Sequence, residues 1–289
     1  MLATDASVKT ALAGVRVSLA RQPADLLLAN CNLVSVWSEE TYTASIAIAG
    51  SRIVAIRPGF DGSARHIIDC SGRYVLPGFI EPLVNPSVDA DTLTAALVPS
   101  GVTSIVLEGA TTTSSSGPSL LRQWRLAADR LGWRGMSGNA RLIHLQRVCT
   151  SALEAADTIA EGEAVILDGG FDPARRLALL HAVAAGGLET ARLMLRHSGA
   201  NDAISASFGV LPVLGAALQA GIPLYRAVQM AGFNAAVQHG IEHDVGSVAP
   251  GRLADLLIVD DIAQAVPSVV ILDGRVVARD GRLEEGAQD

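Results

Sequence analysis

The chain has 289 residues and a formal charge of −7, and 49% of its residues are apolar while only 4% are aromatic. This composition is typical of a compact α/β protein and excludes a disordered or fibrous chain. The negative charge offers no basic surface for nucleic acid, and no apolar run approaches the ~18–20 residues that span a membrane. Because the three cysteines are widely spaced and odd in number, we expect no disulfide framework and a cytoplasmic location.

Lysine is almost absent from this sequence. Of the 22 basic residues all but one are arginines, and the single lysine, Lys9, lies in the N-terminal arm. Chemistry that needs a lysine inside the fold is therefore excluded. That covers Schiff bases, the phosphate-binding lysine of a P-loop and a carboxylated lysine that bridges two metals.

Strand-like segments at both ends of the chain flank a central region in which strands and helices alternate. The first ~20 residues form a short amphipathic helix, and the β-rich stretches follow at 24–69 and again from 254 onward. Alternation in the centre indicates βα units around a parallel sheet. We expect central strands near Val75–Ile80, Thr103–Leu107, Arg141–Leu145, Ala164–Leu167 and Arg192–Leu195, and helices near Ala90–Pro99, Ser119–Leu131, Thr150–Ala160, Ala174–Ala185, Val210–Ala220 and Leu224–Val237.

The simplest assembly pairs the two β-rich ends into one β-sandwich and inserts the α/β region between them. We place the N-terminal helix and the first half of the sandwich at 1–75. The α/β domain follows at 76–245, and the second half of the sandwich at 246–289.

The order of motifs along the chain resembles that of a known family. The motifs are PADLLLANCNLVSVWSEE and HIIDCSGRYVLPGFIEP near the start, SGVTSIVLEG in the middle, and AGIPLYRAVQMAGFNAAVQHGI with VGSVAPGRLADLLIVDD near the end. Together they are similar to the amidohydrolase superfamily, and most closely to its adenine deaminase branch. The resemblance implies a (β/α)₈ barrel that carries hydrolytic chemistry on C–N bonds.

The expected barrel is shortened. A complete (β/α)₈ barrel takes at least ~200 residues, whereas the interval from Val75 to Gly240 holds about 165, or roughly five βα units. We therefore predict an α/β fold in which an incomplete TIM-type β/α barrel is inserted in a β-sandwich formed by the N- and C-terminal segments.

The metal-binding motifs that the resemblance implies are missing. The family carries Asp-x-His-x-His after its first barrel strand, but here Leu83 and Asn85 stand at the two histidine positions. Its second strand leads into Asp-Pro-His-Glu, of which only Glu108 remains. The segment Leu195–Gly199 replaces a metal-binding aspartate, and Asp202 comes several residues later. Leucine has no ligating atom and asparagine is a weak ligand for transition metals. We thus expect no metal and no other cofactor, with zinc or manganese only in a rearranged site.

A set of polar residues could form what remains of the ancestral site. His144 and His197 lie at or near predicted strand ends, where barrel chemistry is built, and acidic residues at other strand ends could converge with them. The weak catalytic candidates are Glu81, Asn85, Glu108, His144, Asp168, His197 and Asp202. We interpret them as a polar rim left over from an ancestral site.

Three other motifs have simpler structural explanations. His239–His243 matches the zinc motif H-x-x-E-H, but Gly240 would interrupt the helix that the motif needs. Asp168-Gly169-Gly170 falls on a Glu-Gly-Ser segment of the family and is interpreted as an ordinary turn. Cys149 is expected at a helix start and is interpreted as a small buried residue.

Two functions of different classes are compatible with these residues. One is an adenine deaminase-like homologue that is catalytically degenerate and acts as a structural or regulatory subunit. The alternative is an active hydrolase or deaminase on C–N bonds other than peptide bonds, with a rearranged or mononuclear metal site. Hydrolytic deamination needs a water whose pKa a cation lowers towards ~7, and a catalytic zinc normally takes three protein ligands. We favour the first function because the family's ligands are missing.

Association with other chains is also expected, with no nucleic acid or membrane partner. A shortened barrel leaves strand edges that need covering, and the mean hydropathy of +0.36 is high for a soluble monomer. A homo-oligomer is the default assembly because two-fold self-association is the commonest. A catalytic amidohydrolase subunit is the other candidate partner.

Overall fold

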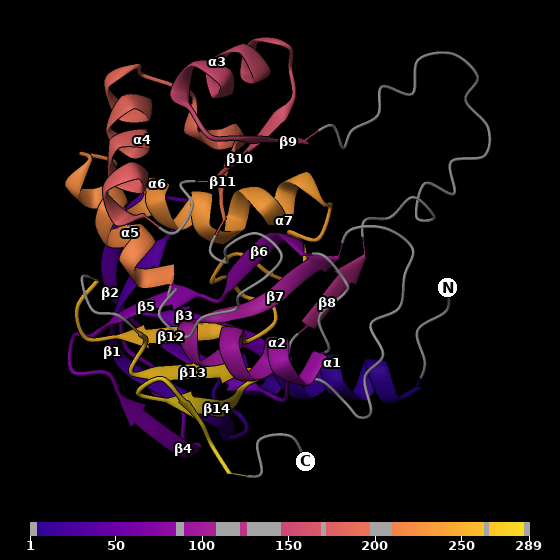
Figure 1. Cartoon of the computed structure of the whole chain (residues 1–289). Helices are drawn as coiled ribbons and strands as arrows, with labels where there is room; N and C mark the ends of the chain where they lie inside the picture. The colour runs from indigo at the N-terminus through magenta and orange to yellow at the C-terminus, as the bar shows by residue number, and fades with distance from the viewer. Residues whose placement is uncertain are drawn as a thin grey trace.

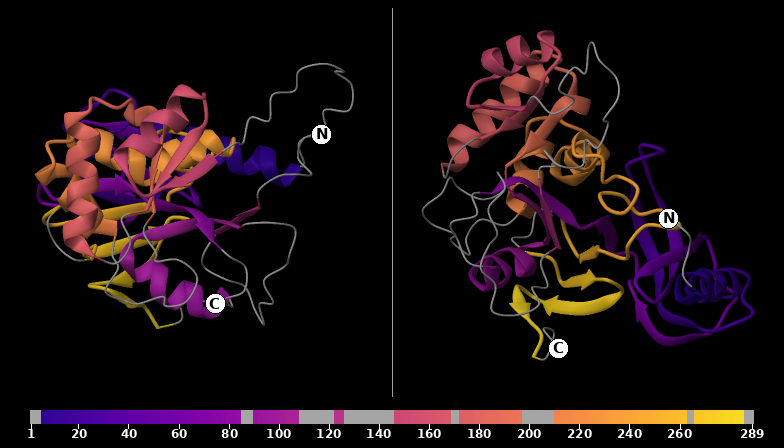
Figure 2. Two further views of the ribbon diagram at one scale, coloured as in Figure 1. Left: turned by 45° about the horizontal axis from the view of Figure 1, so that its top comes forward. Right: turned by 90° about the vertical axis from the view of Figure 1, so that its right-hand side faces the viewer.

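A computed structural model of the chain describes residues 5–84, 90–107, 122–125, 146–168, 172–196, 210–262 and 266–285 (Figure 1). The N-terminal and C-terminal strands lie side by side at one end of the molecule, and the helices α3 and α4 lie at the other (Figure 2). Expected and observed architecture agree, because an α/β region is inserted between two β-rich ends that pair with each other.

The two ends of the chain form one continuous nine-stranded sheet. Its order is β15-β14-β13-β12-β5-β1-β2-β3, with β4 alongside β1. The ends meet where β5 and β12 pair antiparallel, with Val75 opposite Ile258 and Leu76 opposite Leu257. The strands are β1 (Ala24–Ser35), β2 (Glu40–Ala49), β3 (Arg52–Arg57), β4 (Ala64–Asp69), β5 (Tyr74–Pro77), β12 (Leu256–Val259), β13 (Val269–Leu272), β14 (Arg275–Arg279) and β15 (Arg282–Leu283).

Strand β12 is buried on both faces, which explains its unbroken apolar run Leu-Leu-Ile-Val. Leu256 and Ile258 point into a core formed with the inner faces of β1, β2, β3 and β13, so the sheet curls around its own side chains. Leu257 and Val259 point the other way, into the core shared with the α/β region. One short strand thus joins the two parts of the protein.

The α/β region contains two short parallel sheets. One has the order β6-β7-β8 and the other β11-β10-β9, and among the described strands they do not join into a closed ring. The strands are β6 (Phe79–Val84), β7 (Val102–Leu107), β8 (Arg122–Arg125), β9 (Gln146–Cys149), β10 (Ala164–Leu167) and β11 (Leu193–Leu195). The helices are α2 (Ala90–Leu97), α3 (Ala152–Ala160), α4 (Pro173–Ala185), α5 (Val210–Gln219), α6 (Leu224–Val228) and α7 (Asn234–Gln238).

A π-helical turn brings the two parallel sheets together. It comprises Gln229–Phe233, lies between α6 and α7, and packs against both β6 and β11. The expected helix Leu224–Val237 is therefore confirmed, with this turn in its middle. Gly232 lies against the start of β6, where a Cβ would be 3.4 Å from the carbonyl oxygen of Gly78, an ordinary van der Waals contact.

Two local predictions differ from the structure. Arg122–Arg125 lies inside the expected helix Ser119–Leu131, but these residues form strand β8, parallel to β7. This pairing with a distant strand overrides the local helical pattern. The strand expected at Arg141–Leu145 lies outside the described residues. The next segment of the chain, Gln146–Cys149, forms strand β9. Cys149 is therefore the last residue of a strand and does not begin a helix.

Helix α3 begins only after Cys149 because a serine caps it. The Ser151 Oγ accepts a hydrogen bond from the Glu154 backbone N–H at 3.2 Å, which satisfies a donor at the start of the helix. Helix α3 accordingly begins at Ala152 instead of the expected Thr150.

The N-terminal helix α1 (Asp5–Ser18) forms as expected and lies against β2 and β3. Val17 is buried there with Leu27 and Ala47. By contrast, Leu12 and Val15 on the same helix are about half exposed. Within the described parts of the chain, no helix is long and apolar enough to cross a membrane.

Replacing Ile258 by alanine should lower the free energy of unfolding by about 2–5 kcal/mol, because its side chain is fully buried where the two chain ends pair. Denaturant unfolding of the whole chain measures the effect. Ile67→Ala is the matched control: this isoleucine on β4 is 62% exposed, and its loss should change stability by less than about 0.5 kcal/mol. Equal losses in the two variants would contradict the core described above.

Candidate functional site

One residue within a strand and two residues that directly follow strands form the described part of the candidate site. Glu81 lies on β6 and is fully buried, Asp168 follows β10, and Arg196 follows β11. Because β10 and β11 are parallel, their carboxyl ends meet at one edge of the sheet. The Arg196 backbone N–H donates to the Leu167 carbonyl at 3.1 Å, which holds that edge together.

Arg196 lies between the two carboxylates. Its Nε is 3.9 Å from the Oε1 of Glu81, and its Nη1 is 3.4 Å from the Oδ2 of Asp168. The side chain of Arg196 is 10% exposed, that of Glu81 is fully buried, and that of Asp168 is 17% exposed. A charged group this deeply buried needs an opposite charge nearby, and Arg196 supplies it to both acids.

A second guanidinium acts on the same aspartate. Burial lowers the pKa of Arg176 on α4, and the negative charge of Asp168 opposes that shift. Asp168 is thus under the influence of two arginines, Arg176 and Arg196. Arg176 lies on helix α4, which is capped by Asp172. The carboxylate of Asp172 accepts a hydrogen bond from the Ala174 N–H at 2.9 Å.

Sequence reasoning missed the role of Arg196. It noted only that Leu195–Gly199 lacks the family's aspartate. The available signal was an arginine directly after a buried strand, at a place where the resemblance implies an acid. Such a residue needs an acidic partner when it is buried, and Glu81 on another strand provides one.

The described donor set does not fit a metal ion. In the part of the chain that the structure describes, no three His, Cys, Asp or Glu side chains are close enough to hold one. Glu81 and Asp168 are the acids that the structure brings together, and a guanidinium lies between them. Its positive charge opposes the binding of a divalent cation at that point.

The other predicted site residues cannot be placed in this arrangement. Asn85, Glu108, His144, His197 and Asp202 lie outside the described residues. The backbone of Leu83 belongs to β6, and its side chain is outside the description. Of the residues of the expected polar rim, Glu81 and Asp168 are therefore the two that lie within the described residues.

The H-x-x-E-H motif does not lie on one helix. Helix α7 ends at Gln238, and Gly240 has a φ of +65°, a left-handed conformation that ends the helix. His243 lies beyond this turn with its side chain 80% exposed, 3.4 Å from Glu242. The interruption predicted from Gly240 is confirmed.

Cys149 is a buried residue at the end of β9. Its Sγ lies 3.5 Å from the Oγ1 of Thr158. Burial raises the pKa of the Cys149 thiol, which favours the unreactive protonated form. The interpretation as a small buried residue agrees with this environment.

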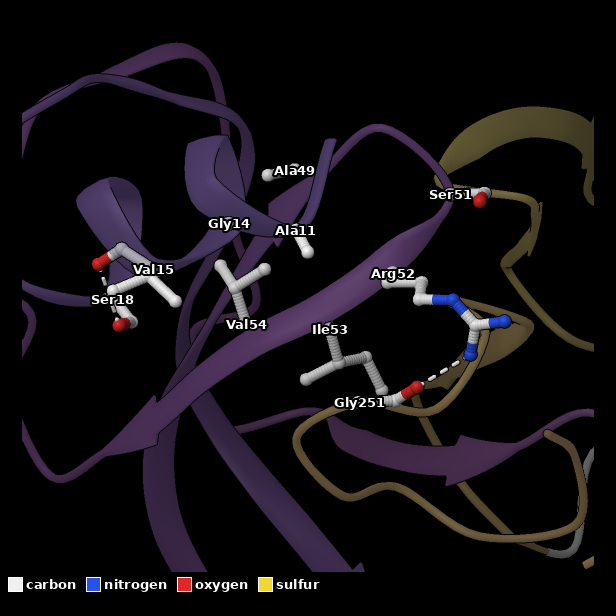
Figure 3. A pocket seen from close by; sticks show the side chains of 10 residues that line it. All are labelled: Ala11, Gly14, Val15, Ser18, Ala49, Ser51, Arg52, Ile53, Val54 and Gly251. Carbon is white, nitrogen blue, oxygen red and sulfur yellow. Dashed lines mark hydrogen bonds between the residues drawn. The ribbon is translucent and has the colours of Figure 1, made fainter. Parts of the chain in front are cut away.

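An open groove of about 490 Å³ lies between α1 and β3 (Figure 3). Small and apolar groups such as Val15 and Val54 line most of it. Among the described residues that line it, Arg52 carries the only charge. Its Nη1 donates to the Gly251 carbonyl at 2.6 Å and its Nη2 lies 2.9 Å from Asp244. The charged group in this groove thus already has partners, and none of the predicted site residues is among the described residues that line the groove.

Comparison with known proteins shows which proteins this chain is similar to. The sequence profile of the amidohydrolase family matches residues 176–277. The adenine deaminase of Mesorhizobium japonicum is 26% identical over 93% of this chain and 59% of its own length, and that of Desulforamulus reducens is 22% identical over 94% and 60%. This chain is a homologue of the amidohydrolase superfamily. The resemblance to its adenine deaminase branch is confirmed.

Solved structures agree on the fold of this amidohydrolase homologue. The β-aspartyl dipeptidase of Fervidobacterium islandicum AW-1 superposes with a TM-score of 0.68 at 15% identity, over 90% of this chain and 98% of that one. The L-hydantoinase of Arthrobacter aurescens gives a TM-score of 0.58 at 14% identity, over 90% and 97%. At such low identity these structures establish the fold alone.

The amidohydrolase homologue is shorter than its relatives within the aligned region. It spans about three fifths of the length of the curated adenine deaminases that it matches. The alignment with the Mesorhizobium japonicum protein runs over 362 positions, more than the 289 residues of this chain. It must therefore include positions with no counterpart here, which agrees with an incomplete barrel.

Replacing Arg196 by methionine should lower the free energy of unfolding by about 3 kcal/mol, because Glu81 would keep a buried charge without its arginine. Thermal or denaturant unfolding at neutral pH measures this. Arg279→Met is the matched control, since Arg279 pairs with Glu284 at the surface and should cost less than about 1 kcal/mol.

The same pair allows a double-mutant cycle. In a Glu81→Gln background the Arg196→Met loss should shrink, because the neutral amide no longer needs the cation. An unchanged loss would show that Arg196 stabilises the fold by some contact other than the one with Glu81.

Proposed function

We propose that this protein is a catalytically degenerate, adenine deaminase-like amidohydrolase homologue that acts as a structural or regulatory subunit. The observation that carries the proposal is Arg196, whose guanidinium lies between Glu81 and Asp168 at the strand ends. The resemblance implies a metal-binding aspartate in this segment. An arginine there reverses the charge of the site.

The chemistry of arginine supports a loss of hydrolytic activity. Hydrolytic deamination needs a water deprotonated near neutral pH, which a bound divalent cation achieves by lowering the pKa of that water. A guanidinium keeps its proton at all physiological pH values and offers only N–H donors, so it cannot act as a base. Arg196 and Arg176 together can balance the charges of Glu81 and Asp168, and this is a structural role.

The catalytic residues of an active site normally remain available to the substrate. Here the buried Glu81 is within 3.9 Å of a cation that belongs to the protein itself. The described acids are thus held in a charge-balanced cluster that needs no ligand. Such a cluster stabilises the fold in the place where the relatives' chemistry is expected.

The whole chain should show no conversion of adenine to hypoxanthine above the background without protein, with or without added Mn²⁺ or Zn²⁺. Elemental analysis after dialysis should find less than one metal ion per chain. The Mesorhizobium japonicum adenine deaminase, assayed in parallel, is the positive control for the assay conditions.

Metal-dependent turnover would overturn this proposal. Turnover that survives Asn85→Ala but is lost in His144→Ala or His197→Ala would support an active hydrolase with a relocated metal site instead. These three variants therefore distinguish the two functions.

A subunit role requires a surface for a partner, and α1 supports one. Leu12, Val15 and Leu19 follow one another at spacings of three and four residues and are each about half exposed. Val15 lines the groove of Figure 3, Leu12 lies about one turn before it on α1, and Leu19 directly follows the end of the helix. Because exposed apolar side chains that gather on one face can mark an interaction site, we propose that α1 contributes to a contact with a second copy of the chain.

Light scattering at low micromolar concentration should give a mass of about twice the 29.9 kDa of one chain. Changing Leu12, Val15 and Leu19 together to glutamine should shift the protein towards one chain mass. Leu153→Gln is the control, since this leucine on α3 is 74% exposed but lies on a different element. A single species at one chain mass for the unaltered protein would contradict self-association.

A further inference from the structure

Two free cysteines lie in contact inside the curled sheet. The Sγ atoms of Cys31 and Cys70 are 3.4 Å apart, although 39 positions separate the residues in sequence. Both side chains are fully buried, and both thiols are reduced in this structure. The third cysteine, Cys149, has a threonine hydroxyl as its neighbour instead. This contact is independent of the candidate site at the strand ends.

A β-bulge in β1 places Cys31. The register between β1 and β2 shifts between Leu28 and Cys31, and Asn30 within the bulge has a φ of +56°. The Asn30 Nδ2 donates to the Oδ1 of Asp69 at 3.0 Å, across to the strand that precedes the second cysteine. The bulge is thus attached to the end of β4.

Backbone hydrogen bonds place Cys70 at the same point. Its N–H donates to the Ala29 carbonyl at 2.8 Å, and the Asn32 N–H donates to the Arg73 carbonyl at 2.9 Å. One of these bonds lies on each side of the two thiols along β1. The cysteines therefore cannot move apart without breaking the ladder between β1 and the turn after β4.

The two sulfurs have different electronic surroundings. The Cys31 thiol donates a hydrogen bond to the Cys70 sulfur, which lowers the pKa of Cys70, and the Arg73 cation also lowers it. The same contact and burial raise the pKa of Cys31. Arg73 is held beside Cys70 because its Nε donates to the Cys70 carbonyl at 3.0 Å. Cys70 is thus suited to attack an oxidant, and Cys31 to react second.

We propose that Cys31 and Cys70 form a modification site at which a small hydroperoxide converts the two thiols into one intrachain disulfide. The Cys70 sulfur attacks the terminal oxygen of the peroxide, the O–O bond breaks, and the departing oxygen takes a proton. This leaves a sulfenic acid on Cys70. The Cys31 sulfur then attacks the Cys70 sulfur, an S–S bond replaces the S–O bond, and the hydroxyl leaves with the Cys31 proton as water.

The balance of this reaction is complete with the named oxidant. Two thiols lose two hydrogens in total, and the hydroperoxide is reduced to water and an alcohol, or to two waters if it is hydrogen peroxide. The sulfurs must close from 3.4 Å to about 2.05 Å. A small neutral oxidant fits the site because both sulfurs are buried, whereas a bulky disulfide would need the sheet to open.

The experiment treats the folded whole chain with hydrogen peroxide and maps its cysteines by alkylation, tryptic digestion and mass spectrometry. Cleavage at arginine places Cys31 in the peptide 22–52 and Cys70 in the peptide 66–73. We expect these two peptides to become linked, while Cys149 remains alkylatable after unfolding. The melting temperature should rise by several degrees, because the disulfide closes a long loop, and a reductant should reverse the rise.

Single variants test the order of the steps. In Cys31→Ala a sulfenic acid should accumulate on Cys70 and be trapped by dimedone, and in Cys70→Ala neither product should form. Cys149→Ala is the matched control and should give the same linked peptides as the unaltered chain. The proposal is overturned if Cys31 and Cys70 are oxidised no faster than Cys149, or only after denaturant is added.

Discussion

The pairing of β5 with β12 is the contact on which the rest of the fold depends. It joins strands from opposite ends of the sequence, and β12 is buried on one side by the curled sheet and on the other by the α/β region. The chain then passes directly from β5 into β6 at Gly78, whose N–H donates to the Asp255 carbonyl at 2.8 Å. A Cβ at Gly78 would lie 2.2 Å from the Oγ1 of Thr103, so only glycine fits at this junction. The position of Glu81 on β6 follows from these constraints.

Burial of Glu81 then decides the electrostatics at the strand ends. A buried carboxylate must be balanced by a cation from solvent, from a ligand or from the protein. In this chain Arg196 supplies the balance and also contacts Asp168. A site that is neutralised from within is stable without a ligand, and this property supports the proposed structural role.

The curled sheet also positions two cysteines in its interior and the helix α1 on its outer face. Its interior brings Cys31 and Cys70 together through a bulge and a tight turn, far along the sequence from each other. The outer face of the same sheet carries α1, with Val17 directed inward and Leu12 directed outward. The β-rich part therefore holds a pair of thiols in contact inside and exposed apolar side chains on α1 outside, while the α/β part holds the charge-balanced cluster.

Local pattern was enough to predict several elements and the family. The apolar run Leu256–Val259 indicates a buried strand because each of its side chains must leave water, and Gly240 predicts the end of α7 because glycine favours a left-handed conformation. The order of such elements also predicts the pairing of the chain ends and the shortened barrel. These features depend on neighbours in sequence, or on the length between motifs.

Contacts between distant segments were decided only by the tertiary structure. Strand β8 at Arg122–Arg125 exists because β7 supplies its hydrogen-bonding partners, and no local pattern encodes that. Arg196 contacts Glu81, and Cys31 contacts Cys70. The residues of each pair are so far apart in the sequence that their spacing does not predict how close they lie in space. Burial selects these partners, because a charge or thiol removed from water must be satisfied by whatever the fold places beside it.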